Sequence, residues 1–553
     1  MTTATAREAE RRASDPEKRL TAAHLLVAHV ALLGGVLTGL LQGLEHAGFD
    51  FPASQYFLQS YYHSVSVHGV LNVLVWTTFF ISGFLPFIAA RGYPIPLVSL
   101  RLGWFTFWLM LAGLVLAAIP LVGNAATVMF TFYAPLKAHW AFYIGLTLVV
   151  VGTWLVTLRL ALTHRIWRAQ HPGERTPLPS FMSLVTMAMW TLASIGLAAE
   201  MLFLLIPWSL GLVSGTDPLL ARTLFWLTGH PIVYFWLLPA YISWYMLMPT
   251  QVGGKLFSDP MARASFLLFL ILSAPLGLHH QVTDPGIHEG WKLFQAFLTF
   301  AVFFPSLLTF FNVVASLESG ARARGGRGWF AWFGKLPWGD PSVAAQLLAM
   351  LMFCAGGIGG LINASYNVNL IVHNTAYIVG HFHTTVGTAV TLTFMGISYW
   401  LVPHLAGRAL WSRGMALTQS WLWFIGMLIF SIALHELGLR GMPRRTMISQ
   451  AAYFQPEWKT LLLWVGVGGT LLFVSGILYL LNLLLTVTIS RHPAPAMPEF
   501  AQVLARAEEG PAFLDRLRPW VVLAAVMVII AYGPTLARLI SGASLNAPGF
   551  RVW

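Results

Sequence analysis

The chain has little charge and almost no cysteine. Of its 553 residues, 9% are charged and 57% are hydrophobic, and the mean hydropathy is +0.70. A soluble domain of this length could not cover such a core with so few charges. The single cysteine, Cys354, excludes disulfides, cysteine-ligated clusters and a dinuclear thiolate copper site within this chain. The sequence therefore predicts an all-α polytopic membrane protein.

Long apolar runs divide the chain into about thirteen segments, each able to provide the ~20 residues that a membrane crossing requires. We expect a polar N-terminal tail at 1–19, a transmembrane bundle at 20–545 and a C-terminal tail at 546–553. The N-terminal tail lacks the apolar core and cleavage site of a signal peptide. The expected segments start near residues 20, 61, 100, 136, 180, 219, 262, 291, 342, 371, 414, 457 and 517.

Lysine and arginine gather in alternate loops, which the positive-inside rule assigns to the cytoplasm. The N-terminus is then cytoplasmic and the C-terminus lies outside. The net charge of +12 reflects this orientation and does not indicate nucleic-acid binding. One basic loop, GLRGMPRRT at 438–446, falls on the outer side and is an exception to the rule.

Six histidines lie in four of the apolar segments, and the loop charges place all of them in the outer part of the bilayer. A histidine inside a membrane segment is costly to bury and usually faces a partner, a cofactor or water. Six at compatible depth predict a site for redox metals. These residues are His68, His230, His279, His280, His381 and His383.

Helical geometry separates the histidines into groups. His381 and His383 are about 200° apart on one helix, so they point to opposite sides and serve two cofactors. His68 can supply the second axial ligand of one of these, which gives a six-coordinate haem suited to electron transfer. The other haem keeps one histidine and an open face for a small ligand.

The remaining three histidines, His230, His279 and His280, suit copper, although iron stays open at this point. Zinc would have no redox role. Tyr234 lies one helical turn after His230, where a phenol can donate an electron and a proton together to split an O–O bond. Pro231 removes a backbone donor and is expected to kink this segment.

Several long motifs agree in order over essentially the whole chain, among them ARTLFWLTGHPIVYFWLLPAY, GGKLFSDPMAR, VHNTAYIVGHFH and MPRRT. They resemble subunit I of the haem–copper oxygen reductases. In detail they look most like the B family, the cytochrome c oxidases known from thermophilic bacteria. The resemblance implies a terminal respiratory oxidase that reduces dioxygen to water and pumps protons. It also implies a bundle built around two haems and one copper.

The resemblance assigns ligands residue by residue. It implies that His68 and His383 hold a low-spin b-type haem, and that His381 is the proximal ligand of a high-spin a-type haem. It implies that the remaining three histidines hold copper, with Tyr234 covalently joined to His230. The family has residues that pair with the haem propionates, and the matching residues here are Arg444, Arg445 and His373. The carboxylates of the propionates would explain why a basic loop lies on the outer side. The usual aspartate partner of that last histidine is replaced here by Asn369.

A single proton-input route is expected. Tyr234, Tyr241 and Tyr245 form one helical stripe that descends about 16 Å toward the cytoplasm. Ser306, Thr309 and Asn312 repeat every three residues on the eighth segment and could face that stripe, or could hold helices together. The family usually has a threonine at the third position. An amide cannot rotate a hydroxyl proton, which puts the relay role of Asn312 in doubt.

Two related groups of enzymes differ from this interpretation at single positions. The A family and the nitric oxide reductases carry a glutamate where this chain has Ile232, and the latter lack the tyrosine. A transporter or a haem-carrying structural subunit would be expected to show midplane charges and broken helices instead.

The expected surroundings follow from the resemblance. They are a bacterial cell membrane, a subunit II with its own copper centre, a possible small single-helix subunit, and cytochrome c as donor. A quinol donor stays open as an alternative.

Overall fold

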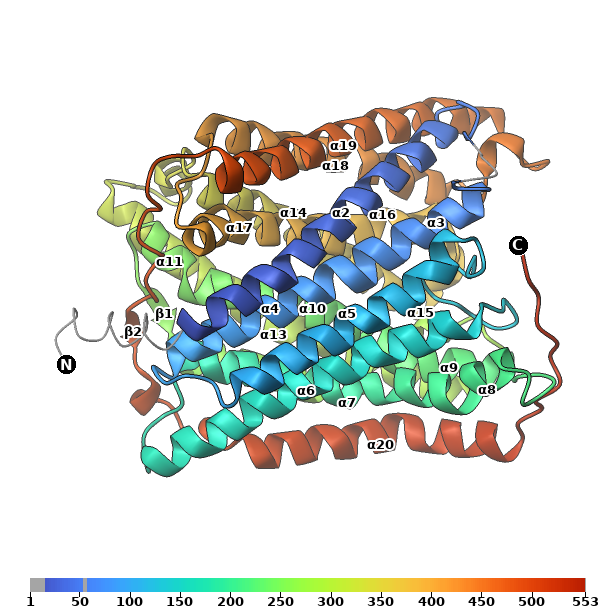
Figure 1. The fold of residues 1–553 in the computed structure, drawn as a ribbon, viewed down its shortest axis with the longest axis horizontal. Helices are drawn as coiled ribbons and strands as arrows, with labels where there is room; N and C mark the ends of the chain where they lie inside the picture. Colours follow the sequence, from blue (N-terminus) through green and yellow to red (C-terminus); the bar gives the residue numbers. More distant parts are fainter. Residues whose placement is uncertain (1–14, 53–56, 553) are drawn as a thin grey trace.

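The computed structural model describes residues 15–52 and 57–552, and these fold into a bundle of long helices that run side by side (Figure 1). Helices dominate because lipid offers no partner for a backbone N–H or C=O. Within the described ranges, twelve helices are long and apolar enough to cross a membrane. A further crossing consists of α9 (Pro218–Gly229) and α10 (Pro231–Met246), which are separated at His230. The expectation of about thirteen crossings agrees with this architecture.

The observed starts differ from the expected ones by a few residues, the largest difference being Ala376 against 371. The other helices are α2 (Lys18–His46), α3 (Tyr61–Gly69), α4 (Thr77–Gly92), α5 (Leu100–Val122), α6 (Trp140–Gln170), α7 (Leu178–Glu200), α8 (Ile206–Ser209), α11 (Met248–Gln251), α12 (Asp259–Ser273), α13 (Glu289–Ala323), α14 (Pro341–Ala364), α15 (Tyr366–Val372), α16 (Ala376–Thr384), α17 (Thr391–Ala406), α18 (Arg413–Leu439), α19 (Lys459–Thr488) and α20 (Leu517–Ser541).

Both helices that carry haem-ligand candidates contain a wide π-helical turn directly beyond the histidines. Val70–Trp76 joins α3 to α4 just after His68, and Thr385–Val390 joins α16 to α17 just after His383. Such turns insert an extra residue into a helix and are frequent at functional sites. In these two segments the backbone departs from regular α-helical geometry.

One end of the bundle gathers the basic loops. Here β1 (Leu256–Ser258) pairs in parallel with β2 (Val503–Ala505), close to the start of α2 at the left of Figure 1. The segment 489–516 runs across this end. Arg91 donates to the carbonyl oxygen of Pro498, and the loop residue Arg408 bridges to Pro493. The loops that the charge rule assigned to one side of the membrane therefore meet at one end of the structure.

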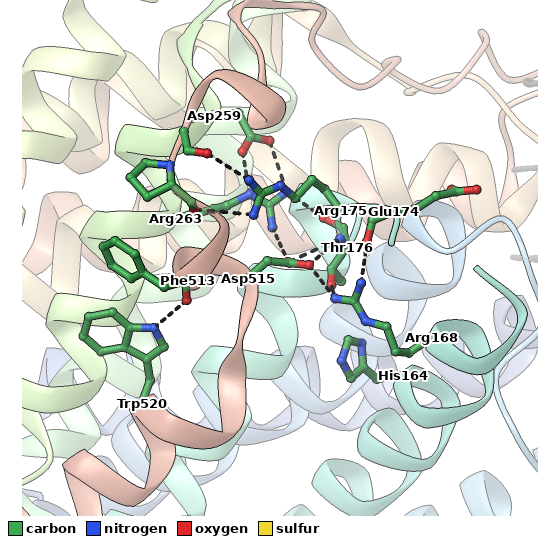
Figure 2. A network of polar contacts seen from close by, with 12 residues as sticks. His164, Arg168, Glu174, Arg175, Thr176, Asp259, Arg263, Phe513, Asp515 and Trp520 are labelled. Carbon is green, nitrogen blue, oxygen red and sulfur yellow. Dashed lines mark hydrogen bonds and ion pairs between the residues drawn. The ribbon is translucent and has the colours of Figure 1, made fainter. Parts of the chain in front are cut away.

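A buried ion-pair cluster fastens this end (Figure 2). Arg263 of α12 donates to Asp515 at 2.9 Å, to Asp259, and to the carbonyl oxygen of Thr176 at 2.6 Å. Asp515 also accepts from Arg168 of α6 and from the backbone N–H of Thr176. Since Asp515 lies two residues before α20, the cluster ties that peripheral helix to α6, α7 and α12.

The described parts of the two expected tails lie at opposite ends of the bundle (Figure 1). Of the N-terminal tail 1–19, residues 1–14 lie outside the described residues, and Glu17 pairs with the buried Arg159 through two hydrogen bonds of 2.7 and 2.8 Å. The C-terminal tail 546–553, described to residue 552, is bound to the opposite end of the bundle. Ala547 pairs with Thr216, and Phe550 accepts from the backbone N–H of Lys137.

Candidate functional site

Three of the predicted histidines meet at a cavity of about 260 Å³. His230 stands at the break between α9 and α10, where Pro231 starts the second helix in a position that requires no N–H. His279 and His280 lie on a 3-10 turn, Leu278–Gln281, that follows α12. A Cβ on the preceding Gly277 would stand 2.1 Å from the carbonyl oxygen of Trp226, so only glycine lets this turn pack against α9.

The nitrogen atoms of this cluster are arranged as metal ligands. One ring nitrogen from each of the three histidines lies within 4.8 Å of the others. The Nδ1 of His230 is 3.0 Å from the Nε2 of His280. The Nδ1 of His279 bonds the hydroxyl of Thr299 at 3.1 Å, which leaves its Nε2 for a metal. Three imidazoles without a carboxylate fit copper.

Two aromatic side chains complete the cluster. Trp226 stacks on His280 with ring centroids 3.9 Å apart and planes 5° from parallel, which fixes the imidazole plane. The hydroxyl of Tyr234 lies 3.3 Å from the Nε2 of His230, on the ring edge opposite to the Nδ1 that faces His280. The structure thus brings Tyr234 beside the three histidines without making it one of the metal ligands.

His381 lines the same cavity from α16. Its Nδ1 edge packs against α14, because a Cβ added to Gly359 would be only 2.8 Å from that nitrogen. The Nε2 edge is therefore the one available to an iron within the cavity. A haem held by this single histidine would share its cavity with the three-histidine cluster and with Tyr234, an arrangement that suits a haem with one open face.

His68 and His383 face one another across a second cavity of about 190 Å³. Their ring centroids are 6.4 Å apart and their planes are within 15°. Two metal–nitrogen bonds of about 2.0–2.1 Å plus the two ring radii account for a separation of about 6 Å. Each Nδ1 donates to a backbone carbonyl at 2.8 Å, of Gly35 and Val379 respectively, which leaves both Nε2 atoms as ligands. This pair fits a six-coordinate haem.

Glycines on α2 make room for this arrangement. A Cβ on Gly39 would be 2.8 Å from the ring of His68, and one on Gly35 would be 2.1 Å from the side chain of Asn72. The stretch GGVLTG therefore lets α3 approach α2 closely enough for His68 to reach the second cavity.

Arg444 and Arg445 line both cavities from the loop between α18 and α19. Arg444 donates to the Oδ1 of Asn374 at 2.8 Å, and Arg445 donates to Thr131 and lies 4.8 Å from the ring of Phe130. Neither forms an ion pair with a carboxylate in the described part of the chain. Burial, together with the positive charge of Arg445, lowers the pKa of Arg444 to about 9. These guanidiniums suit anionic groups within the cavities.

His373 lies at the same end of the first cavity. Its Nδ1 bonds the Oδ1 of Asn369 at 3.0 Å, and the amide of Asn369 donates in turn to the carbonyl oxygen of Asn363. Burial and the charges of Arg444 and Arg222 lower the pKa of His373 to about 4. The imidazole is therefore neutral near pH 7, and Asn369 orients it without titrating.

The expected proton-path residues are only partly together. Tyr241 and Tyr245 are fully buried on α10, with Ser306 beside the first and Thr309 beside the second. Thr309 is 2.7 Å from the hydroxyl of Ser265 on α12. The amide of Asn312 instead bonds both the N–H and the carbonyl of Ser258, at 3.0 and 2.8 Å. Asn312 therefore fastens the start of α12 to α13.

Sequence reasoning did not find the residues that orient the histidines. Thr299 and Trp226 are ordinary helix residues whose importance depends on which neighbouring helix they face. Trp226 lies four residues before His230, and that helical spacing was the one signal available for either of them.

The chain is similar to known proteins over nearly its full length. The family model described as "Cytochrome C and Quinol oxidase polypeptide I" matches residues 19–471. Cytochrome c oxidase subunit 1 of Thermus thermophilus is 45% identical over 551 residues, covering 97% of this chain and 97% of that protein. Cytochrome c oxidase polypeptide 1 of Halobacterium salinarum is 28% identical over 450 residues, covering 75% and 69%. A cryo-EM structure of a heme-copper terminal oxidase dimer has a TM-score of 0.92 and 37% identity, covering 97% of this chain and 95% of that chain.

Proposed function

Because the chain belongs to the cytochrome c and quinol oxidase subunit I family, we propose that it is the catalytic subunit of a proton-translocating respiratory oxidase that reduces dioxygen to water. Family membership implies haem, copper, a subunit II and a membrane setting. One observation carries the proposal: three histidine nitrogens within 4.8 Å share a cavity with His381 and Tyr234.

The donor sets support a distribution of the cofactors. His68 and His383 would hold a low-spin b-type haem, His381 a high-spin a-type haem, and the cluster of His230, His279 and His280 a copper ion. When bound, the high-spin haem and the copper supply the redox chemistry for dioxygen. The protein contributes the spacing of the ligands and a mostly apolar cavity wall, which includes Phe225, Ile232 and Val233.

Tyr234 would supply a proton and an electron from its hydroxyl when the O–O bond breaks. Its position at 3.3 Å from the Nε2 of His230 also suits the covalent link between these two side chains that the family resemblance implies. Since that nitrogen is turned away from His280, the link would leave the Nδ1 of His230 free to bind copper.

Protons would enter along Tyr245, Tyr241 and Tyr234, with Ser306 and Thr309 lining the path. The buried hydroxyls of Tyr241 and Tyr245 have no hydrogen-bond partner of good geometry among the described residues, and a buried hydroxyl of this kind is well suited to bind water in a polar channel. Asn312 is left out of this route because its amide is engaged by the backbone of Ser258.

The proposed setting is a bacterial cell membrane with the basic-loop end in the cytoplasm and the C-terminal segment outside. The two cavities then lie toward the outer surface, where electrons would arrive from cytochrome c through the copper centre of subunit II. A small single-helix subunit is a further expected partner. The exposed apolar side chains of α20, such as Val522, Ile529 and Ile540, suit contact with lipid.

Oxygen consumption by the purified complex tests this proposal. We expect rapid consumption with reduced cytochrome c and little with a quinol, together with copper in the preparation. A preparation that reduces nitric oxide, contains no copper and leaves dioxygen untouched would identify a nitric oxide reductase instead. If the rate with a quinol exceeds the rate with cytochrome c, the protein is still an oxidase, but its electron donor is a quinol.

A further inference from the structure

A buried carboxylate and a histidine stand side by side at the end of α2. Glu45 is fully buried, and its Oε2 is 2.8 Å from the Nδ1 of His46. Its Oε1 accepts from both the N–H and the hydroxyl of Ser449, at 2.9 and 2.6 Å. A carboxyl group that accepts three hydrogen bonds is stabilised in its ionised form.

His46 lies between a carboxylate and a mostly apolar cavity. The Nδ1 of His46 faces the Glu45 carboxylate, and His46 is also one of the residues that line the second cavity, together with His68 and His383. Tyr61 stacks against it with centroids 6.0 Å apart and lines the same cavity. His46 is also in the last turn of α2, where the helix dipole favours a cation.

The connection to Ser449 is informative because of where that residue lies. Ser449 follows Arg445 by four residues, in the loop whose two arginines reach both cavities. Glu45 therefore joins α2 to the arginine loop, and His46 stands on the α2 side of the cavity wall to which Arg444 and Arg445 contribute. All three residues line one mostly apolar cavity, and each of their side chains carries N–H donors.

We propose that His46 is a further binding residue of the low-spin haem site: an imidazolium that donates from Nε2 to a haem carboxylate, while Glu45 holds its Nδ1 and is a positioning residue. This rests on the proposed function, which puts a haem in the second cavity. The assignment gives that haem's carboxylate edge a cationic partner from α2 in addition to the arginine pair, and gives the buried Glu45 a role beyond joining α2 to the loop.

The test compares variants of the full complex by two readouts on the low-spin haem: its midpoint potential and the vibrational band of ¹³C-labelled propionates. His46→Leu removes a positive charge, so oxidised iron is favoured about threefold. This lowers the midpoint potential by about 28 mV, because a tenfold change in the equilibrium of a one-electron couple corresponds to about 59 mV. The propionate band shifts as its hydrogen bond is lost. His46→Lys restores the potential.

Two further variants separate contact from net charge. Glu45→Gln combined with His46→Leu leaves net charge unchanged, so the potential moves less than in His46→Leu while the propionate band still shifts. His139→Leu, an exposed histidine at the start of α6 that lines neither cavity, alters neither readout. If His46→Leu retains the wild-type potential and propionate band, His46 merely satisfies Glu45 and the inference is wrong. Absence of a low-spin haem from the wild-type complex would overturn the proposed function itself.

Discussion

Arginines at the two ends of the bundle have opposite kinds of partner. At the basic-loop end, Arg263 is 3% exposed and is paired with two carboxylates of the chain, Asp259 and Asp515 (Figure 2). At the other end, Arg444 and Arg445 meet amide, hydroxyl and aromatic groups, and form no ion pair with a described carboxylate. Arg263 is buried and is neutralised by carboxylates of this chain, whereas Arg444 and Arg445 are partly exposed and have no such carboxylate beside them among the described residues.

The difference indicates what each end is for. Breaking a buried pair by removing one partner is strongly destabilising, so the cluster around Asp515 reads as a structural fastening. An arginine pair without a carboxylate of its own, lining two cavities that also contain histidines, suits an anion from outside the chain. Under the proposed function, haem propionates would be these anions. Variants at the fastening should therefore change stability, and variants at the cavity end should change cofactors or turnover.

Removing a proposed haem ligand should have the largest effect. We expect His381→Ala to lose the high-spin haem and activity while retaining the low-spin haem, and His68→Ala to do the reverse, because the two residues line different cavities. Optical difference spectra of the purified complexes measure this. Loss of the same haem in both variants would show that the two cavities are not separate cofactor sites.

Tyr234→Phe should lower oxygen reduction by about 10²–10⁴-fold, the range expected when a positioned proton donor is removed. Both haems and copper should be retained, because the hydroxyl is a neighbour of His230 and is not placed as a ligand. The checks are turnover and metal content. Tyr93→Phe, which changes a tyrosine at the basic-loop end, is the matched control and should keep its activity. Normal turnover in Tyr234→Phe would exclude the phenol from the chemistry.

Asp515→Asn should cost about 3–5 kcal/mol, because it leaves Arg263 and Arg168 without their shared buried carboxylate. Thermal unfolding in detergent is the measurement, and the haem spectrum of the folded complex should not change. Glu318→Gln removes an exposed pair with Arg322 and should cost at most about 0.5 kcal/mol. Equal stability of the two variants would mean that the buried cluster is not a fastening.

Thr309→Val should give the smallest of these changes, slowing turnover and proton pumping together by several-fold with haem spectra intact. Its hydroxyl lies between Ser265 and the backbone of α13 beside Tyr245. Stopped-flow and pH-jump measurements in vesicles follow both rates. Thr186→Val, a buried threonine with a similar bond to the preceding turn, is the control. If Thr309→Val and Ser306→Ala together leave turnover unchanged, these residues only hold helices together.

Much of this could be predicted from the sequence because the dominant physics is local. The lengths of the apolar runs predicted the membrane-crossing helices, and the charges of the loops predicted which loops lie at the same end of the bundle. Helical spacing put His381 and His383 on opposite faces, toward two cavities. The break at His230 was expected only as a kink. It is a separation into two helices because Pro231 starts a new one.

What the sequence could not predict depends on contacts between distant segments. Asn312 fits the periodic trio on α13, but its amide is captured by Ser258, 54 residues earlier in the chain. Glu45 and Ser449 are 404 residues apart, and no local pattern links them. The orienting partner Thr299 likewise becomes evident only when the turn that carries His279 is folded against α13.

Metal analysis of the complex with and without His230→Ala tests whether the three-histidine cluster holds copper. We expect the variant to lose one copper per chain relative to wild type, to keep both haem irons, and to retain the same unfolding temperature to within a few degrees. The three-histidine cluster would then be a copper site within an otherwise intact bundle. Unchanged copper, with an iron lost in its place, would show that the cluster binds a different metal and supports a different chemistry.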